Sequence, residues 1–216
     1  MTAHAVTSEV GVCSLAMGYL KLAPLNSIDE PVSEQEIQCA EVFHQVRRRT
    51  LEMYPWNFAK KRAVLSASLD TPEFGFTRKY AFRNDHIRFL SRHHDDGTPM
   101  SITAEDYDIE DGFFLTNADA DTTINIKYVS DHKQVGKWSP LFLSLLATEI
   151  AVDVGHRFVT GNNWLEQVRK ERDRLRVVAG AIDGQQRPPR RVQRSKWIAR
   201  RRQGTQVAGP NLYFRS

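Results

Sequence analysis

Residues 47–65 of this chain read RRRTLEMYPWNFAKKRAVL, and a change of pattern inside this stretch sets the plan of the fold. Before Pro55 the apolar residues follow helical spacing, and proline then ends the helix because it has no amide hydrogen to donate. From Arg62 onward the period changes to two, which is typical of strands. The stretch therefore predicts a passage from a long helix into a β region. We expect Pro55, Trp56 and Phe58 to form a structural junction, in which the two aromatic side chains plug the core.

Two helices are expected before this junction. Apolar residues recur at helical spacing from Val10 to Leu20, and Pro24 ends that pattern. Ser33, followed three residues later by Glu36, is a capping box that opens a second helix. This second helix runs to the junction.

A β region is expected between the junction and residue 137. Tyr107 and Ile109 alternate with acidic residues, and Asp111 with Gly112 offers a hairpin turn. Further strands are predicted at residues 87–90 and 124–129. Together these segments indicate a small antiparallel barrel or sandwich.

Helical spacing then resumes. Ser139 is a predicted cap with Pro140 at the first helical position. A fourth helix is predicted with Asn163 as its cap, and Gly180 and Gly184 are predicted to end it.

The expected fold class is therefore α+β. Residues 1–61 and 138–184 form a four-helix bundle, residues 62–137 form an inserted antiparallel β-barrel or sandwich domain, and residues 185–216 form an extended basic C-terminal arm. No run of apolar residues is long enough to predict a membrane span or a signal peptide.

Charge is distributed unevenly along the chain. The net charge is +4, yet the residues after Asp183 include nine basic and no acidic side chains, which leaves residues 1–183 at −5. Such an arm usually seeks an anionic partner or an acidic protein groove. Trp197 and Ile198 lie within it as apolar anchors, so we interpret the arm as a docking element. The candidate docking residues are Arg187, Arg190, Arg191, Arg194, Lys196, Trp197, Ile198, Arg200, Arg201 and Arg202.

No candidate for catalysis or metal binding emerges. The acidic stretch 106–112 has Asp111 where a calcium loop needs glycine, so a strand edge with a turn is favoured. Residues 93–96 (HHDD) contain metal-ligand types but fit a polar loop better. On the third helix, an ion pair between Asp153 and Arg157 is favoured over a metal site. We expect no enzyme and no cofactor.

The two cysteines, Cys13 and Cys39, lie among apolar residues and are expected to be free thiols. Arg47, Arg48 and Arg49 span more than one helical face, so they could form a solvated surface or meet an acidic neighbour. A solvated surface or a subunit contact is favoured over binding of nucleic acid.

Five segments together resemble one known family. They are residues 47–65, 80–85 (YAFRND), 126–129 (IKYV), 138–142 (WSPLF) and 195–200 (SKWIAR). Their order and spacing resemble tail tubular protein A, the head-to-tail adaptor of T7-like short-tailed phages. In that family an arginine-rich helix ends in a Pro-Trp-x-Phe-Ala turn before the β insert. One departure is Arg83, where the family usually has proline.

The resemblance implies a structural virion protein at the head-tail junction, made in the host cytoplasm. It implies a ring, expected to be a dodecamer, between the portal protein above and a tail nozzle similar to tail tubular protein B below. Double-stranded DNA would pass through the ring during genome ejection. The alternatives are a sequence-tolerant DNA-binding protein that uses the basic arm and, with less support, a hydrolase that degrades cell walls.

Overall fold

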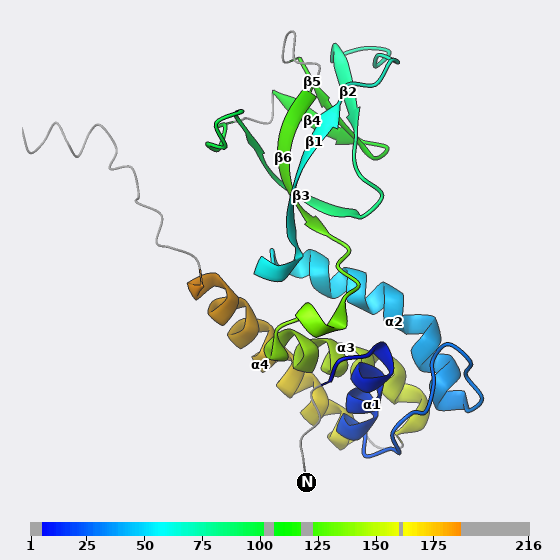
Figure 1. Cartoon of the computed structure of the whole chain (residues 1–216). Helices are drawn as coiled ribbons and strands as arrows, with labels where there is room; N and C mark the ends of the chain where they lie inside the picture. Colours follow the sequence, from blue (N-terminus) through cyan, green and yellow to red (C-terminus); the bar gives the residue numbers. More distant parts are fainter. Residues whose placement is uncertain (1–5, 102–105, 118–122, 160–161, 187–216) are drawn as a thin grey trace, which may run out of the picture. The chain divides into compact units, whose positions relative to one another are not determined.

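The computed structural model describes residues 6–101, 106–117, 123–159 and 162–186 of the 216-residue chain. The described residues up to Gly184 belong to one compact unit, which is mixed α+β (Figure 1). The helices are α1 (Glu9–Tyr19), α2 (Glu34–Met53), α3 (Pro140–Phe158) and α4 (Asn162–Gln185), with short 3-10 turns at Asn57–Ala59 and Val135–Lys137. The strands are β1 (Lys60–Ser66), β2 (Arg78–Ala81), β3 (His86–His93), β4 (Tyr107–Glu110), β5 (Phe113–Thr116) and β6 (Thr123–Ser130).

The predicted helix starts at Ser33 and Ser139 are confirmed. Ser33 accepts a hydrogen bond from the amide of Glu36, whose side chain in turn accepts one from the amide of Ser33. Ser139 caps α3 by accepting from the amide of Phe142 at 3.2 Å, with Pro140 in the first turn. Both starts depend on signals within four residues, which explains why the sequence reveals them.

Helix α4 differs from its prediction at both ends. It begins at Asn162, so Asn163 lies inside the helix and is not its cap. It also continues through Gly180 to Gln185. A methyl group added at Gly180 would lie 3.5 Å from the Tyr54 ring, and one added at Gly184 would lie 2.8 Å from the Tyr54 hydroxyl. The helix therefore continues past Gly180, where an added methyl group would make only an ordinary contact, and it ends one residue after Gly184, which lies close to the Tyr54 hydroxyl.

Helix α3 is the centre of the helical part. Buried residues recur all round it, and it contacts both α1 and α2. A helix that is apolar on every side is typical of a core helix. The helical core also includes Ala59, Val129 and Trp138 from the segments that lead into and out of the strands.

The strands form two antiparallel sheets, with the orders β1-β6-β3 and β2-β5-β4. An isolated bridge between Ala67 and Tyr80 links them. A separate apolar cluster of Leu65, Tyr80, Phe114, Ile124, Ile126 and Tyr128 lies between the sheets. Within the described ranges the strands do not close into a barrel, because β3 and β4 remain the outer strands of their sheets.

The predicted turn between β4 and β5 is confirmed. Asp111 and Gly112 have φ values of 45° and 76°, and positive φ at both central residues is characteristic of the tightest hairpins.

Among the described helices, none combines the length and the apolar composition that a membrane span requires.

Candidate functional site

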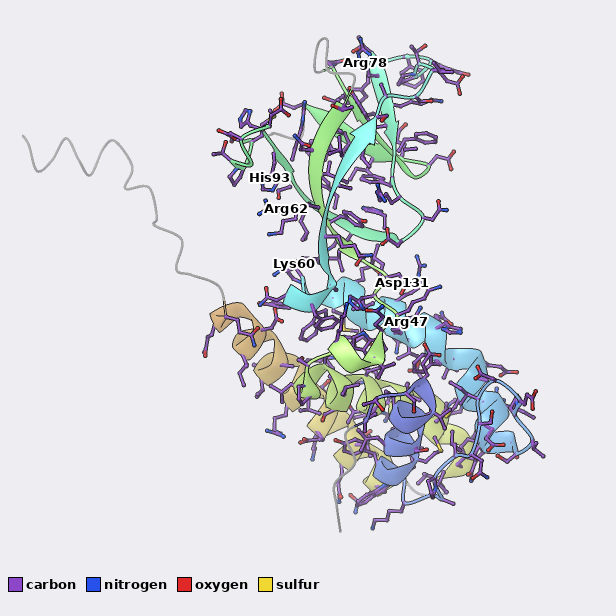
Figure 2. The ribbon with its side chains drawn as sticks, viewed as in Figure 1. Arg47, Lys60, Arg62, Arg78, His93 and Asp131 are labelled. Carbon is purple, nitrogen blue, oxygen red and sulfur yellow. The ribbon has the colours of Figure 1, made fainter. Side chains whose placement is uncertain are left out.

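Buried polar contacts connect the helices to the strands at one joint. Its centre is Arg47 of α2, whose side chain is 2% exposed. The Nε and Nη2 atoms of Arg47 each donate to a carboxylate oxygen of Asp131 at 3.1 Å, and Glu9 lies 3.5 Å from Nη1. Figure 2 shows Arg47 and Asp131 meeting between α2 and the end of β6.

Arg47 therefore meets an acidic neighbour and is not part of a solvated surface with Arg48 and Arg49. A two-pronged pair between guanidinium and carboxylate fixes direction as well as distance. Asp131 directly follows β6, and its amide donates to the carbonyl of Asp85 at 2.7 Å. The pair thus ties the exit of the β region to the middle of α2.

The other two arginines remain partly exposed. Arg48 is 51% exposed and lies 3.5 Å from Asp131, while Arg49 is 42% exposed and bonds Asp153 at 3.0 Å. Arg49, and not Arg157 as the sequence suggested, is the partner found for Asp153. A subunit contact through Arg48 and Arg49 stays a prediction.

An aromatic cluster fills the same joint. Trp56 is 1% exposed, its Nε1 donates to the carbonyl of Thr50 at 3.0 Å, and its ring centroid lies 5.1 Å from that of Phe142. Phe58 packs edge-on against Phe142 at 4.9 Å, and Trp138 does so at 5.3 Å. Trp56 and Phe58 of the predicted junction thus lie against the first turns of α3.

Helix α4 is attached to the same turn. Both carboxylate oxygens of Asp183 accept from the amide of Asn57, at 3.0 and 3.1 Å, and the Asn57 side chain donates to the Asp183 carbonyl at 2.6 Å. Asp183 is 6% exposed. The last turn of α4, from which the basic arm departs, is therefore fixed to the start of the β region.

A second buried carboxylate links α3 to α4. Glu149 is 1% exposed and accepts from Arg176 at 2.6 and 2.9 Å, with Arg49 at 3.6 Å. The hydrogen bonds that Arg176 donates to Glu149 are the main cause of the raised pKa of Arg176. No local pattern in the sequence predicts this pair, because its partners lie on different helices.

The predicted docking residues Arg187, Arg190, Arg191, Arg194, Lys196, Trp197, Ile198, Arg200, Arg201 and Arg202 all lie outside the described residues. Their role stays a prediction.

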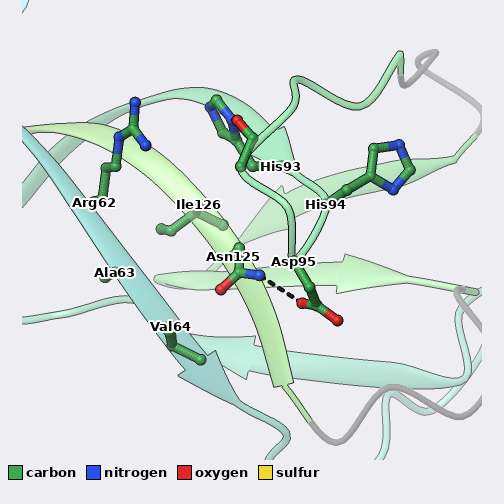
Figure 3. Close-up of a pocket in the computed structure, with 9 residues that line it drawn as sticks. Arg62, Ala63, Val64, His93, His94, Asp95, Asn125 and Ile126 are labelled. Carbon is green, nitrogen blue, oxygen red and sulfur yellow. Dashed lines mark hydrogen bonds between the residues drawn. The ribbon is translucent and has the colours of Figure 1, made fainter.

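A small cleft of about 250 Å³ opens on the outer side of the β1-β6-β3 sheet (Figure 3). Arg62 and His93 flank it, and Asn125 donates to Asp95 across it at 2.8 Å. The His93 ring already contacts the Gly97 carbonyl and the Ser91 hydroxyl, both at 3.0 Å. His93 is therefore the last residue of β3, held against the turn that follows it, and residues 94–96 form the polar loop that the sequence favoured.

The possible metal ligands and the two cysteines were also located in the structure. Within the described ranges no three histidine, cysteine or acidic side chains gather as a metal site would require. Cys13 and Cys39 are buried free thiols. Their mutual hydrogen bond, and then burial, raise the pKa of Cys13, which keeps that thiol protonated.

Neither the protein-family models nor the curated proteins give a match to this chain.

Proposed function

We propose that this chain is a head-to-tail adaptor of a short-tailed phage, a structural subunit of a ring between portal and tail nozzle. The fold assigned by this proposal is a four-helix bundle with an inserted barrel or sandwich and a basic arm. It places the protein in the virion, with the portal, the nozzle, further copies of itself and the passing DNA as partners. The role is structural and not enzymatic.

One observation carries the proposal. Three segments that resemble the adaptor family are far apart in the sequence, yet they meet at one joint. Trp56 comes from segment 47–65, Val129 from segment 126–129 and Phe142 from segment 138–142, and all three belong to one buried cluster. A shared set of residues that builds one joint is stronger support than a list of separate resemblances.

The joint also suits a subunit that must hold its two parts in a fixed orientation within a ring. The β region is connected to the helices by two chain passages, near residues 59 and 131, and both are fixed by buried contacts. At the first passage the hydroxyl of Ser130 donates to the carbonyl of Ala59 at 2.9 Å. Two connections held by buried contacts fix the orientation of the β region relative to the helices better than one flexible linker would.

The alternative from another class is a DNA-binding protein that uses the basic arm. Binding of free duplex by such an arm depends on total charge and falls steeply with salt. Docking into a protein groove depends instead on a buried aromatic anchor. The two functions therefore make opposite predictions for Trp197 and Arg190.

The test compares Trp197→Ala and Arg190→Ala in the full chain. We expect Trp197→Ala to weaken co-sedimentation with purified portal rings more than Arg190→Ala does. Binding of free duplex DNA should respond in the opposite order. A chain that binds duplex tightly, ignores portal rings and is insensitive to Trp197→Ala would favour the DNA-binding alternative.

A further inference from the structure

The outer face of the β2-β5-β4 sheet does not pack against the other sheet, although Leu115 at its centre is only 6% exposed. The register puts Asp108, Leu115 and Lys79 in one row and Glu110, Phe113 and Ala81 in the next, all on the same face. The opposite face contains Tyr80 and Phe114, which are buried against the other sheet. The exposed part of this face is the groove between the strands and the loop that joins β1 to β2.

The loop between β1 and β2 turns this face into a groove of about 430 Å³. Asn117 holds the loop: its side chain accepts from the amide of Thr77 at 3.0 Å and donates to the carbonyl of Gly75 at 3.3 Å. Gly75 has a φ of 81°, which glycine tolerates best. The loop then projects Phe74, which is 87% exposed.

The groove combines apolar surface with negative charge. Phe74, Phe76 and Phe113 line it together with four carboxylates, Glu73, Asp108, Glu110 and Asp111. Its single lysine, Lys79, lies 5.0 Å from the centre of the Phe113 ring and 3.6 Å from Asp70. An exposed phenylalanine within an acidic rim is typical of a surface that receives a basic segment with an aromatic anchor.

The chain itself contains a segment of that chemistry. Residues 187–202 include eight basic side chains and no acidic one, with Trp197 and Ile198 between them. We propose that the groove binds residues 187–202 of a second copy of this chain. Arginines of the segment meet the four carboxylates, while Trp197 packs against Phe74.

We assign the segment to a second copy because it and the groove lie at different places on the chain. When one copy's segment binds the groove of the next copy, the contact is head-to-tail. Repetition of such a contact closes a ring when the rotation between copies fits, so this step rests on the ring of the proposed function. An extended segment from Arg187 to Trp197 spans up to about 35 Å, which is enough to reach a neighbour. Each contact is weak alone, and ring closure multiplies its effect.

The test measures binding of a fluorescent peptide of residues 187–202 to the full chain by anisotropy at low salt. The receptor carries Arg190→Glu and Arg191→Glu, so that its own arm does not compete. We expect the peptide to bind the receptor. The double substitution Glu73→Lys with Glu110→Lys in the receptor should weaken this binding at least about tenfold, since both carboxylates are exposed and line the rim of the groove. Phe74→Ala in the receptor, or Trp197→Ala in the peptide, should weaken it without any change of charge.

The matched control is Glu41→Lys with Glu52→Lys, which makes the same charge change on exposed positions of α2. This receptor should bind the peptide within about twofold of the unaltered one. Equal losses in the control and groove receptors would reduce the effect to general charge attraction and overturn the proposal. An undiminished affinity in the groove receptor, or no peptide binding at all, would overturn it as well.

Failure of this inference differs from failure of the adaptor role. If the peptide ignores the groove but the chain still forms rings on the portal, the adaptor stands and the arm docks elsewhere. If the peptide binds the groove as described but portal rings recruit no chain, the groove stands and the adaptor role falls.

Discussion

The guanidinium of Arg47 and the carboxylate of Asp131 are 84 residues apart in the chain, yet they form a two-pronged ion pair with side-chain exposures of 2% and 7%. The pair therefore joins the middle of α2 to the exit of the β region with almost no water around it. Loss of one partner would leave the other charge buried without compensation.

Asp131→Ala is expected to lower the free energy of unfolding by about 3 kcal/mol or more, because the Arg47 charge stays buried without its main partner. Arg48→Ala is the control, since Arg48 is 51% exposed and contacts the same carboxylate at 3.5 Å. It should cost less than about 1 kcal/mol. Urea unfolding of both variants measures the difference, and equal small losses would show that the pair is not structural.

Trp56→Ala should be among the most damaging single substitutions. Trp56 is 1% exposed and contacts Phe142, and truncation of a buried aromatic costs about 3–5 kcal/mol. Phe74→Ala removes an aromatic ring that is 87% exposed and should change stability by less than about 0.5 kcal/mol. Thermal unfolding measures both, and an unchanged melting temperature for Trp56→Ala would remove this ring from the core.

Two helical glycines should respond in opposite directions to alanine. At Gly155 of α3 an added methyl group would lie 2.9 Å from Leu165 and 3.0 Å from Leu20, and overpacking of this kind costs about 1–3 kcal/mol. At Gly18 of α1 nothing lies within 4 Å, so alanine should stabilise the helix by about 0.5–1 kcal/mol. Denaturant unfolding distinguishes them, and stabilisation by Gly155→Ala would contradict the close approach of α4.

Acid should lower the stability of the fold through Glu36, whose carboxylate holds the segment before α2. Amides of Ser33, Val32, Asn26 and Ser27 donate to its carboxylate and lower its pKa to about 2 from 4.5. A lowered pKa in the folded state means that the contribution to stability is present above about pH 4.5 and is lost as the pH falls toward 2. Glu36→Gln should therefore flatten the fall of stability between these pH values. An identical pH profile for wild type and variant would exclude this role of Glu36.

The sequence predicts the local features of this fold well and the long-range ones poorly. The capping box at Ser33 and the turn at Asp111 depend on residues within four positions, and both are confirmed. Gly180 was interpreted as a helix end because its contact with Tyr54 is not visible in the sequence. The acidic neighbour of Arg47 could not be named for the same reason, since Asp131 lies far along the chain.

Two packed sheets were one of the two predicted arrangements, but the order of the strands within them lay beyond the sequence. The alternating pattern predicts strands and their faces, but strand order depends on pairing between distant segments. The β6 strand pairs with both β1 and β3, while β5 pairs with β2 and β4. The acidic groove depends on the β2-β5-β4 sheet, because pairing of β2 with β5 brings the loop that contains Phe74 beside Asp108 and Glu110 of β4.

The central claim is that this chain adds a ring to a phage portal. Electron microscopy of purified portal rings mixed with the full chain tests it most directly. We expect a new ring of density beneath the portal, continuous with its channel and absent when the chain is omitted. Portal particles without added density, at chain concentrations well above those of the portal, would contradict the claim.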